Sequence, residues 1–206
     1  MNKADLEKKI STLASEKASE LLNLLVFNRL SDEQIANQPA SYHHHDNVKG
    51  GWLAHINKML NICQLVIGQY RSFFYNNTDK PIQSNIDLLI CSVVLHDIGK
   101  FDEQTLDGYT EVGNKLTHTT LCICLLAQNK QQIVDLYDED FFIDLLSAVA
   151  GHHNGYNSES AKSVIAQILF EIDNFESDLT EIEQKYRTSV ADDKTFVTFD
   201  GKYLYL

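Results

Sequence analysis

The sequence is poor in the features that mark several classes of protein. Its 206 residues include only two prolines and nine glycines, so little in the composition interrupts long helices. None of its four cysteines belongs to a Cys-x-x-Cys pair, and all lie in apolar, helix-like stretches, which favours small core residues in a reducing cytosol. No apolar run approaches the length of a membrane span, and the first ten residues lack the apolar segment of a signal peptide. We therefore expect a cytoplasmic protein without a membrane partner.

Positive charge is also scarce. The chain has 17 Lys and Arg against 29 Asp and Glu, which gives a formal net charge of −12. Such a surface repels nucleic-acid backbones at long range, so we expect no binding to a long duplex. A small nucleotide, or a short nucleic-acid end held by local cations, remains compatible with this charge.

What the chain does contain is a series of segments with helical spacing of apolar residues. These segments are 4–26, 52–70, 86–97, 116–126 and beyond, 139–150, and 161–174 with more helix to 186. The motif Ser-Asp-Glu-Gln at 31–34 predicts the capping box of a short helix, and Gly99 is expected to end the buried helix 86–97. Residues 101–115 are polar and predict a loop.

The tail predicts a different structure. Residues 195–206 alternate around Asp200 and Gly201, which predicts a β-hairpin. The fold class is therefore all-α, a helical bundle over 1–190, with a small C-terminal β-hairpin appendage over 191–206. The hairpin would cover the bundle or offer its edge to a partner, so an oligomer is allowed.

The histidines are not scattered. Three form a loop cluster at 43–45, and five lie in or at the ends of predicted core helices, at positions 55, 96, 118, 152 and 153. Asp97 follows His96 at the end of the apolar run 88–95, and Asp173 falls on the apolar face of a later helix. A buried charged carboxylate costs several kcal/mol or more unless a partner offsets it. Asp97 must therefore either reach solvent or meet a cation.

Each of these residues alone has an ordinary structural explanation. A single core histidine is usually hydrogen-bonded, and a single Asp at a helix end is usually a cap or a solvated charge. Five histidines and two carboxylates at helix ends and apolar edges are harder to explain in that way. Bundled helices would bring them to one pocket, where imidazole and carboxylate ligands suit a divalent transition metal.

The order of these motifs resembles the HD-domain metal-dependent phosphohydrolase superfamily. The blocks that carry the resemblance are HHDNVKGGWLAH (44–55), LHDIGK (95–100), GNKLTH (113–118), GHHNG (151–155) and EIDNFE (171–176). More narrowly, they are similar to the HD domain of bacterial 3′-to-5′ exoribonucleases and to the nuclease domain of CRISPR helicase-nucleases. The resemblance spans about residues 43 to 176. Those exoribonucleases carry a nucleic-acid-binding β-barrel ahead of this domain, whereas here the N-terminus predicts helix.

The resemblance implies a division of ligands between two metal ions. His55, His96, Asp97 and Asp173 would bind one ion, and Asp97 would bridge to a second ion held by His118, His152 and His153. Manganese or iron is expected, while nickel, cobalt and zinc also accept these ligands. The implied activity is that of a two-metal phosphodiesterase, in which metal-activated hydroxide attacks a nucleotide, a cyclic nucleotide or a short oligonucleotide end.

Three further residues are candidates for contact with the phosphate ester. Lys100 follows His96-Asp97 by one helical turn, either as a phosphate or carboxylate partner at the site or as a cation at a helix C-terminus. His44 and His45 would line the pocket mouth. Two other functions stay open: a di-iron HD-type oxygenase, and a non-catalytic metal- or nucleotide-binding module.

Overall fold

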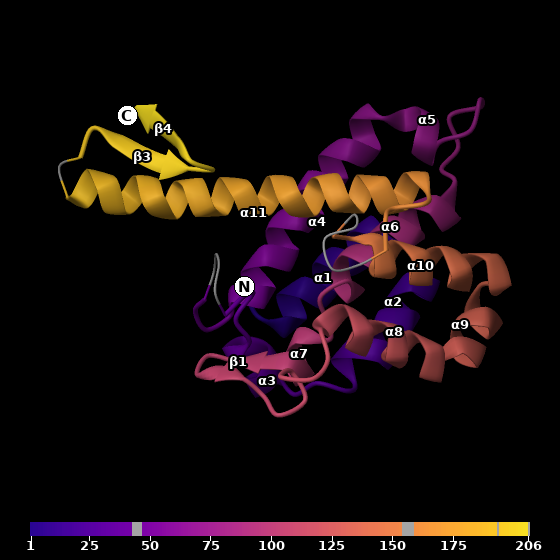
Figure 1. Cartoon of the computed structure of the whole chain (residues 1–206). Helices are drawn as coiled ribbons and strands as arrows, with labels where there is room; N and C mark the ends of the chain where they lie inside the picture. Colours follow the sequence, from indigo (N-terminus) through magenta and orange to yellow (C-terminus); the bar gives the residue numbers. More distant parts are fainter. Residues whose placement is uncertain (43–46, 154–158, 193, 206) are drawn as a thin grey trace.

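A computed structural model of the chain describes residues 1–42, 47–153, 159–192 and 194–205, and most of them are helical (Figure 1). The helices are α1 (Lys3–Leu13), α2 (Glu16–Leu22), the π-helix η1 (Asn23–Phe27), α3 (Asp32–Asn37), α4 (Gly51–Gln69), α5 (Arg71–Phe74), α6 (Gln83–Leu95), α7 (Lys100–Glu103), α8 (His118–Gln128), α9 (Lys130–Leu136), α10 (Glu139–Gly151) and α11 (Val164–Ala191). The strands are β1 (Gln104–Thr105), β2 (Gly108–Tyr109), β3 (Phe196–Phe199) and β4 (Lys202–Tyr205). The predicted all-α class with a small C-terminal hairpin is confirmed.

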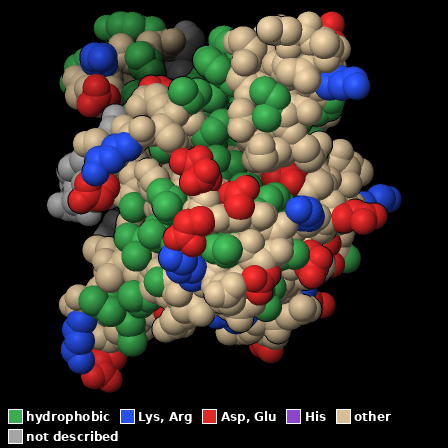
Figure 2. Space-filling view, turned by 90° about the vertical axis from the view of Figure 1, so that its right-hand side faces the viewer, with side chains coloured by type: hydrophobic (Ala, Val, Ile, Leu, Met, Phe, Trp, Pro, Cys, Tyr) green, Lys and Arg blue, Asp and Glu red, His purple; other side chains and the backbone are tan. Residues whose placement is uncertain are grey.

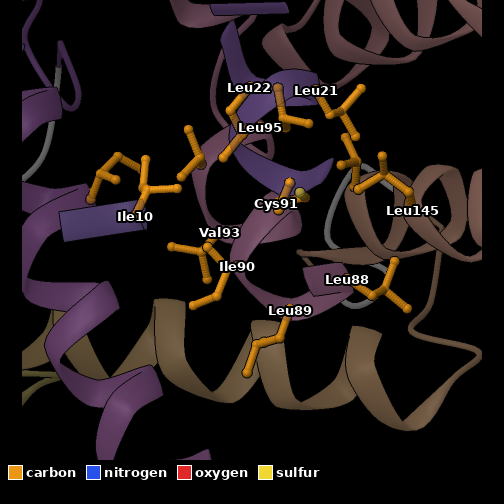
Figure 3. Packing of buried hydrophobic residues seen from close by; sticks show 14 of the residues in the cluster. Ile10, Leu21, Leu22, Leu88, Leu89, Ile90, Cys91, Val93, Leu95 and Leu145 are labelled. Carbon is orange, nitrogen blue, oxygen red and sulfur yellow. The ribbon is translucent and has the colours of Figure 1, made fainter. Parts of the chain in front are cut away.

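Helix α6 lies at the centre of the bundle. Every residue from Ile86 to Leu95 is buried, because α6 packs against α2, α4, α10 and α11. Figure 3 shows Leu89 pointing towards α11 and Leu88 on the same side of α6 as Leu145 of α10. A helix that is apolar on all sides belongs in the middle of a fold. The unbroken apolar run in the sequence therefore forms the central helix, and His96 and Asp97 directly follow its C-terminal end.

The C-terminal hairpin packs on the distal part of α11. Strands β3 and β4 pair antiparallel, with Phe196 opposite Tyr205 and Phe199 opposite Lys202. Asp200 and Gly201 both have positive φ, at 47° and 68°, as a two-residue hairpin turn requires. Val197 is buried because its strand packs against α11.

The expected continuous helix over 4–26 is wrong. The chain leaves the helical conformation at Ala14, and Ser15 begins α2 as its N-cap. The Ser15 backbone N–H donates to Asp87 Oδ1 on α6 at 2.9 Å, and the Ser15 hydroxyl donates to Asp87 Oδ2. These two hydrogen bonds to the buried Asp87 carboxylate hold the chain in its non-helical conformation between α1 and α2. The capping box at Ser31 is confirmed.

The expectation that Gly99 ends the buried helix as a C-cap is also wrong. Helix α6 ends at Leu95, and Gly99 has ordinary right-handed helical angles, with φ −66°. A Cβ at this position would lie 2.2 Å from the His118 carbonyl oxygen. The glycine is therefore required for the close approach of α8 rather than for a left-handed turn.

Three smaller expectations need correction. The segment 101–115 is not all loop, because it contains the end of α7 and the β1–β2 hairpin. Helix α11 is one continuous helix of 28 residues that runs to Ala191, beyond the expected end. Cys63, Cys91 and Cys122 are buried as predicted, but Cys124 is exposed. Cys124 follows the buried Cys122 by two residues on α8, and this offset turns its side chain to the solvent side of the helix.

Candidate metal centre

Three helices bring one group of ligands together. His96 is the residue after the last turn of α6, Asp97 follows it, His55 lies in the second turn of α4, and Asp173 lies on α11. The Nε2 atom of His55 is 3.3 Å from Asp173 Oδ1, and the Nε2 atom of His96 is 3.4 Å from Asp97 Oδ2. We call His55, His96, Asp97 and Asp173 the buried cluster, because all four are almost fully removed from solvent.

Two other helices supply a second group. His118 is the first residue of α8, where Thr117 caps the helix, and His152 and His153 directly follow the last residue of α10. The Nε2 atoms of His118 and His153 are 3.0 Å apart, and the ring centroids of His118 and His152 are 5.6 Å apart. We call His118, His152 and His153 the pocket cluster. His152 is buried, whereas His118 and His153 are only partly buried.

Asp97 lies between the two clusters. Its Oδ2 is 3.4 Å from His96 Nε2 and 3.9 Å from His55 Nε2. Its Oδ1 is 3.5 Å from His118 Nε2 and 4.0 Å from His152 Nε2. Each carboxylate oxygen therefore faces a different cluster.

Three buried polar atoms at this centre have no hydrogen-bond partner among the described residues. They are Asp97 Oδ1, His96 Nε2 and His152 Nε2. Buried polar atoms in native proteins are nearly always paired, so three that converge on one space are consistent with a metal-binding site. Two sets of donor atoms, from His55, His96 and Asp97 and from His118, His152 and His153, lie within 4.8 Å of one another in each set. Nitrogen and oxygen donors of this kind fit a divalent transition metal.

Burial and neighbouring charges set the protonation state of each candidate ligand. Burial favours a neutral Asp97, but the charges of Lys100 and His96 outweigh it and hold the pKa of Asp97 well below its usual range. Burial, with nearby His96 and His153, lowers the pKa of His152, and burial also lowers the pKa of His153. Burial lowers the pKa of His55, but hydrogen bonds to Asp173 and Glu176 outweigh this and raise it to about 9. The Asp97 carboxylate is thus ionised and the imidazoles of His152 and His153 are neutral, whereas His55 is protonated at neutral pH and would release a proton on binding a metal.

Lys100 is the cation that Asp97 meets inside the protein. Its Nζ is 2.6 Å from Asp97 Oδ2, and only 13% of its side chain is exposed. Burial lowers the pKa of Lys100, but the Asp97 charge outweighs it and raises the pKa. The contact with a carboxylate, rather than with a helix-end carbonyl, favours the first of the two predicted roles of Lys100.

A pocket of about 440 Å³ opens beside both clusters. The end of the pocket nearest the two clusters is lined by His55, Asp173, Lys100, His118 and His153. The remaining lining is polar or acidic and consists of Ser41, Glu103, Gln104, Tyr109, Thr117, Thr119, Ser177, Asp178 and Glu181. The face in Figure 2 carries interspersed acidic, basic and apolar side chains and shows no described histidine, so the clusters do not reach the surface there. His44 and His45 lie outside the described residues.

Two site residues are absent from the sequence-based set. Glu176 contacts His55 Nδ1, and Glu103 Oε2 lies 3.0 Å from His118 Nδ1. Glu176 could have been found, because it lies three residues after Asp173 and so shares a helix face with it. Glu103 gives no such signal, since it precedes His118 by fifteen residues and reaches it only through the fold.

Comparison with known proteins agrees with this geometry. The HD-domain family profile matches residues 52–178, which include all seven residues of the two clusters. Proteins named 3′-5′ exoribonuclease YhaM are similar to the chain: 25% identical over 160 residues in Bacillus pumilus, 24% over 159 in Bacillus subtilis and 26% over 160 in Bacillus licheniformis. Each match covers 74% of this chain and 46% of the relative, so the chain spans about half the length of these relatives.

No solved structure gives a significant match. In the described part of the chain, no helix has both the length and the apolar character needed to cross a bilayer. The profile match extends over most of the bundle and includes the helices that carry both clusters. The chain belongs to the HD-domain family.

Proposed function

We propose that this protein is a metal-dependent phosphohydrolase, and specifically a two-metal phosphodiesterase. The observation that carries the proposal is the position of Asp97, whose two oxygens face two separate histidine clusters. A carboxylate that faces two ligand sets in this way is suited to bridge two ions. The buried, unpartnered atoms at the same place support the same conclusion.

In this proposal the buried cluster holds one ion and the pocket cluster holds the other, with Asp97 shared. Two such ions, when bound, neutralise phosphate oxygens and lower the pKa of a water nucleophile. We propose manganese or iron as the bound ions, and the mixed imidazole and carboxylate ligand set also accepts nickel, cobalt or zinc. The burial of His55, His96 and Asp97 keeps water away from the ligands and preserves their orientation.

Lys100 has two tasks in the proposal. Its ammonium group keeps Asp97 ionised in apolar surroundings, and it lines the pocket next to the ligands. A phosphate oxygen that enters the pocket would meet this ammonium group as a hydrogen-bond donor. Phosphate contact by His44 and His45 stays a prediction.

The substrate we propose is a nucleotide, a cyclic nucleotide or a short nucleic-acid end. The relatives are named as exoribonucleases, which favours a nucleic-acid phosphodiester. The pocket volume of about 440 Å³ suits a small ligand. The α11 wall of the pocket presents Asp178 and Glu181, and these carboxylates would repel additional phosphates along that direction. A long strand is therefore disfavoured.

Elemental analysis paired with a hydrolysis assay tests the proposal. The protein would be analysed as purified and then assayed with bis-p-nitrophenyl phosphate under added Mn²⁺. We expect about two metal ions per chain and diester cleavage that an Asp97→Ala variant lacks. A series of short oligoribonucleotides would then define the substrate length.

The same measurements separate the alternatives. Two irons without hydrolysis, together with oxygen consumption on inositol-like or phosphonate substrates, would indicate a di-iron oxygenase. No metal, and no uptake of added metal, would indicate a non-catalytic module. Either result would overturn the phosphodiesterase proposal.

A further inference from the structure

Four histidines of the two clusters differ in what holds the ring nitrogen that faces away from the centre. His96 Nδ1 donates to the Val93 carbonyl at 2.8 Å, and His152 Nδ1 donates to the Val149 carbonyl at 2.6 Å. His55 Nδ1 contacts the carboxylate of Glu176, and His118 Nδ1 lies 3.0 Å from the carboxylate of Glu103. Each cluster thus has one histidine held by a backbone carbonyl and one held by a glutamate.

We propose that Glu176 and Glu103 are positioning residues, each of which fixes the tautomer and ring orientation of one metal-binding histidine. Glu176 would serve His55 in the buried cluster, and Glu103 would serve His118 in the pocket cluster. This inference rests on the proposed metal centre. An ionised carboxylate only accepts hydrogen bonds, so it keeps the proton on Nδ1 and leaves the Nε2 lone pair free for a metal.

Glu176 is itself held in place by two other groups. Only 2% of it is exposed, its Oε1 accepts from the Thr180 hydroxyl at 2.6 Å, and Lys58 Nζ lies 3.1 Å from the same oxygen. One carboxylate oxygen therefore serves Thr180 and Lys58, and the other serves His55. An amide at this position would keep its oxygen towards the Lys58 ammonium and turn its NH₂ towards His55.

Glu103 makes both of its contacts with one residue. Its Oε1 accepts from the His118 backbone N–H at 2.7 Å, while its Oε2 faces His118 Nδ1. A glutamine offers only one acceptor oxygen, and the backbone N–H cannot change its role. The glutamine NH₂ would therefore face Nδ1, move the imidazole proton to Nε2 and aim an N–H at the metal.

The test compares Glu176→Gln and Glu103→Gln with two matched controls. Glu171→Gln changes an exposed residue of α11 whose carboxylate accepts from the Gln167 amide, and Asp102→Asn removes a half-exposed carboxylate paired with Arg29. Isothermal titration calorimetry with Mn²⁺ would give the affinity of the protein for each ion. In each Gln variant we expect the affinity for one ion to be 10- to 100-fold weaker. In the double variant the affinity for both ions should be weaker, and in the controls it should not change.

Histidine tautomers provide a readout that does not depend on metal. Nitrogen-15 NMR of the metal-free protein, recorded above the pKa of about 9 of His55 so that its ring is neutral, would assign the proton of His55 and His118 to Nδ1 or Nε2. We expect Nδ1–H in the wild type, a shift to Nε2–H in the matching Gln variant, and recovery of Nδ1–H in Glu176→Asp and Glu103→Asp. The Asp variants also serve if a Gln variant fails to fold.

The outcomes separate this inference from the proposed function. If the wild type binds no metal, the proposed function fails, whereas the tautomers still test the positioning role. If the wild type binds two ions and the Gln variants bind them equally well with unchanged tautomers, the inference fails alone. Equal weakening of both ions by a single Gln variant would also overturn it, because that result indicates a general structural role.

Discussion

The buried cluster and the pocket cluster share Asp97 but differ in charge. The buried cluster has two carboxylates, Asp97 and Asp173, whereas the pocket cluster adds three imidazoles and no carboxylate of its own. In the proposed centre, a divalent ion in the buried cluster would be largely neutralised by its ligands, and an ion in the pocket cluster would keep more of its positive charge. Two residues of each cluster border the pocket, His55 and Asp173 of the first and His118 and His153 of the second. We therefore expect the buried cluster mainly to retain metal and the pocket cluster mainly to attract a phosphate.

The largest test removes the shared ligand. We expect Asp97→Ala to lose both ions and to reduce diester hydrolysis to background. The variant also leaves Lys100 buried without its partner, so the free energy of unfolding should fall by about 3–5 kcal/mol. Elemental analysis and urea denaturation would measure both effects, with the exposed Asp107→Ala as the control. Full metal content in Asp97→Ala would contradict the bridging assignment.

Single histidine variants would show whether each cluster binds its own ion. His55→Ala should lose the ion of the buried cluster, and His118→Ala should lose the ion of the pocket cluster, because each removes a ligand that faces only one set. Activity should fall by at least about 100-fold in both variants. Metal content per chain and the hydrolysis rate would be measured together. If either variant lost both ions, the two clusters would be one cooperative site and the comparison would fail.

Removal of metal should have an intermediate effect on stability. Ions that bind only the folded chain stabilise it by about 2.7 kcal/mol when their concentration is 100 times Kd. Treatment with a chelator should therefore lower Tm by several degrees, since about 1 kcal/mol shifts Tm by roughly 2–4 °C in a chain of this size. Differential scanning calorimetry would check this. The shift should be smaller in His55→Ala and His118→Ala, and a wild-type Tm unaffected by the chelator would count against stabilising metal.

The smallest expected effect tests how the fold supports the pocket cluster. Gly99→Ala places a Cβ 2.2 Å from the His118 carbonyl oxygen, so the start of α8 must shift. We expect the free energy of unfolding to fall by about 1–3 kcal/mol and the affinity to fall for the pocket-cluster ion only.

Gly68→Ala is the matched control for this substitution, because a Cβ there meets nothing within 4 Å. Helix propensity should make it neutral or slightly stabilising, by up to about 1 kcal/mol. Thermal denaturation and Mn²⁺ titration would compare the two variants. Equal effects on both ions in Gly99→Ala would show that the contact supports the whole centre.

The sequence predicted the parts of this molecule that depend on periodicity and residue type. The buried helix could be predicted because an unbroken apolar run needs burial on every side, and Asp97 at its end demanded a cation. The break at Ser15 could not be predicted, since its cause is Asp87, which lies 72 residues away. The role of Gly99 was missed for the same reason, because only the fold brings His118 against it. Glu103 likewise gained its role through tertiary contact.

Helix α11 carries Asp173 and Glu176 and then continues for fifteen residues beyond Glu176, with the terminal hairpin packed along that extension. At 1.5 Å per residue its 28 residues form a rod about 42 Å long. Asp173 and Glu176 therefore lie on the same rigid element as the surface that carries the hairpin, and a tilt of this helix would displace both residues together.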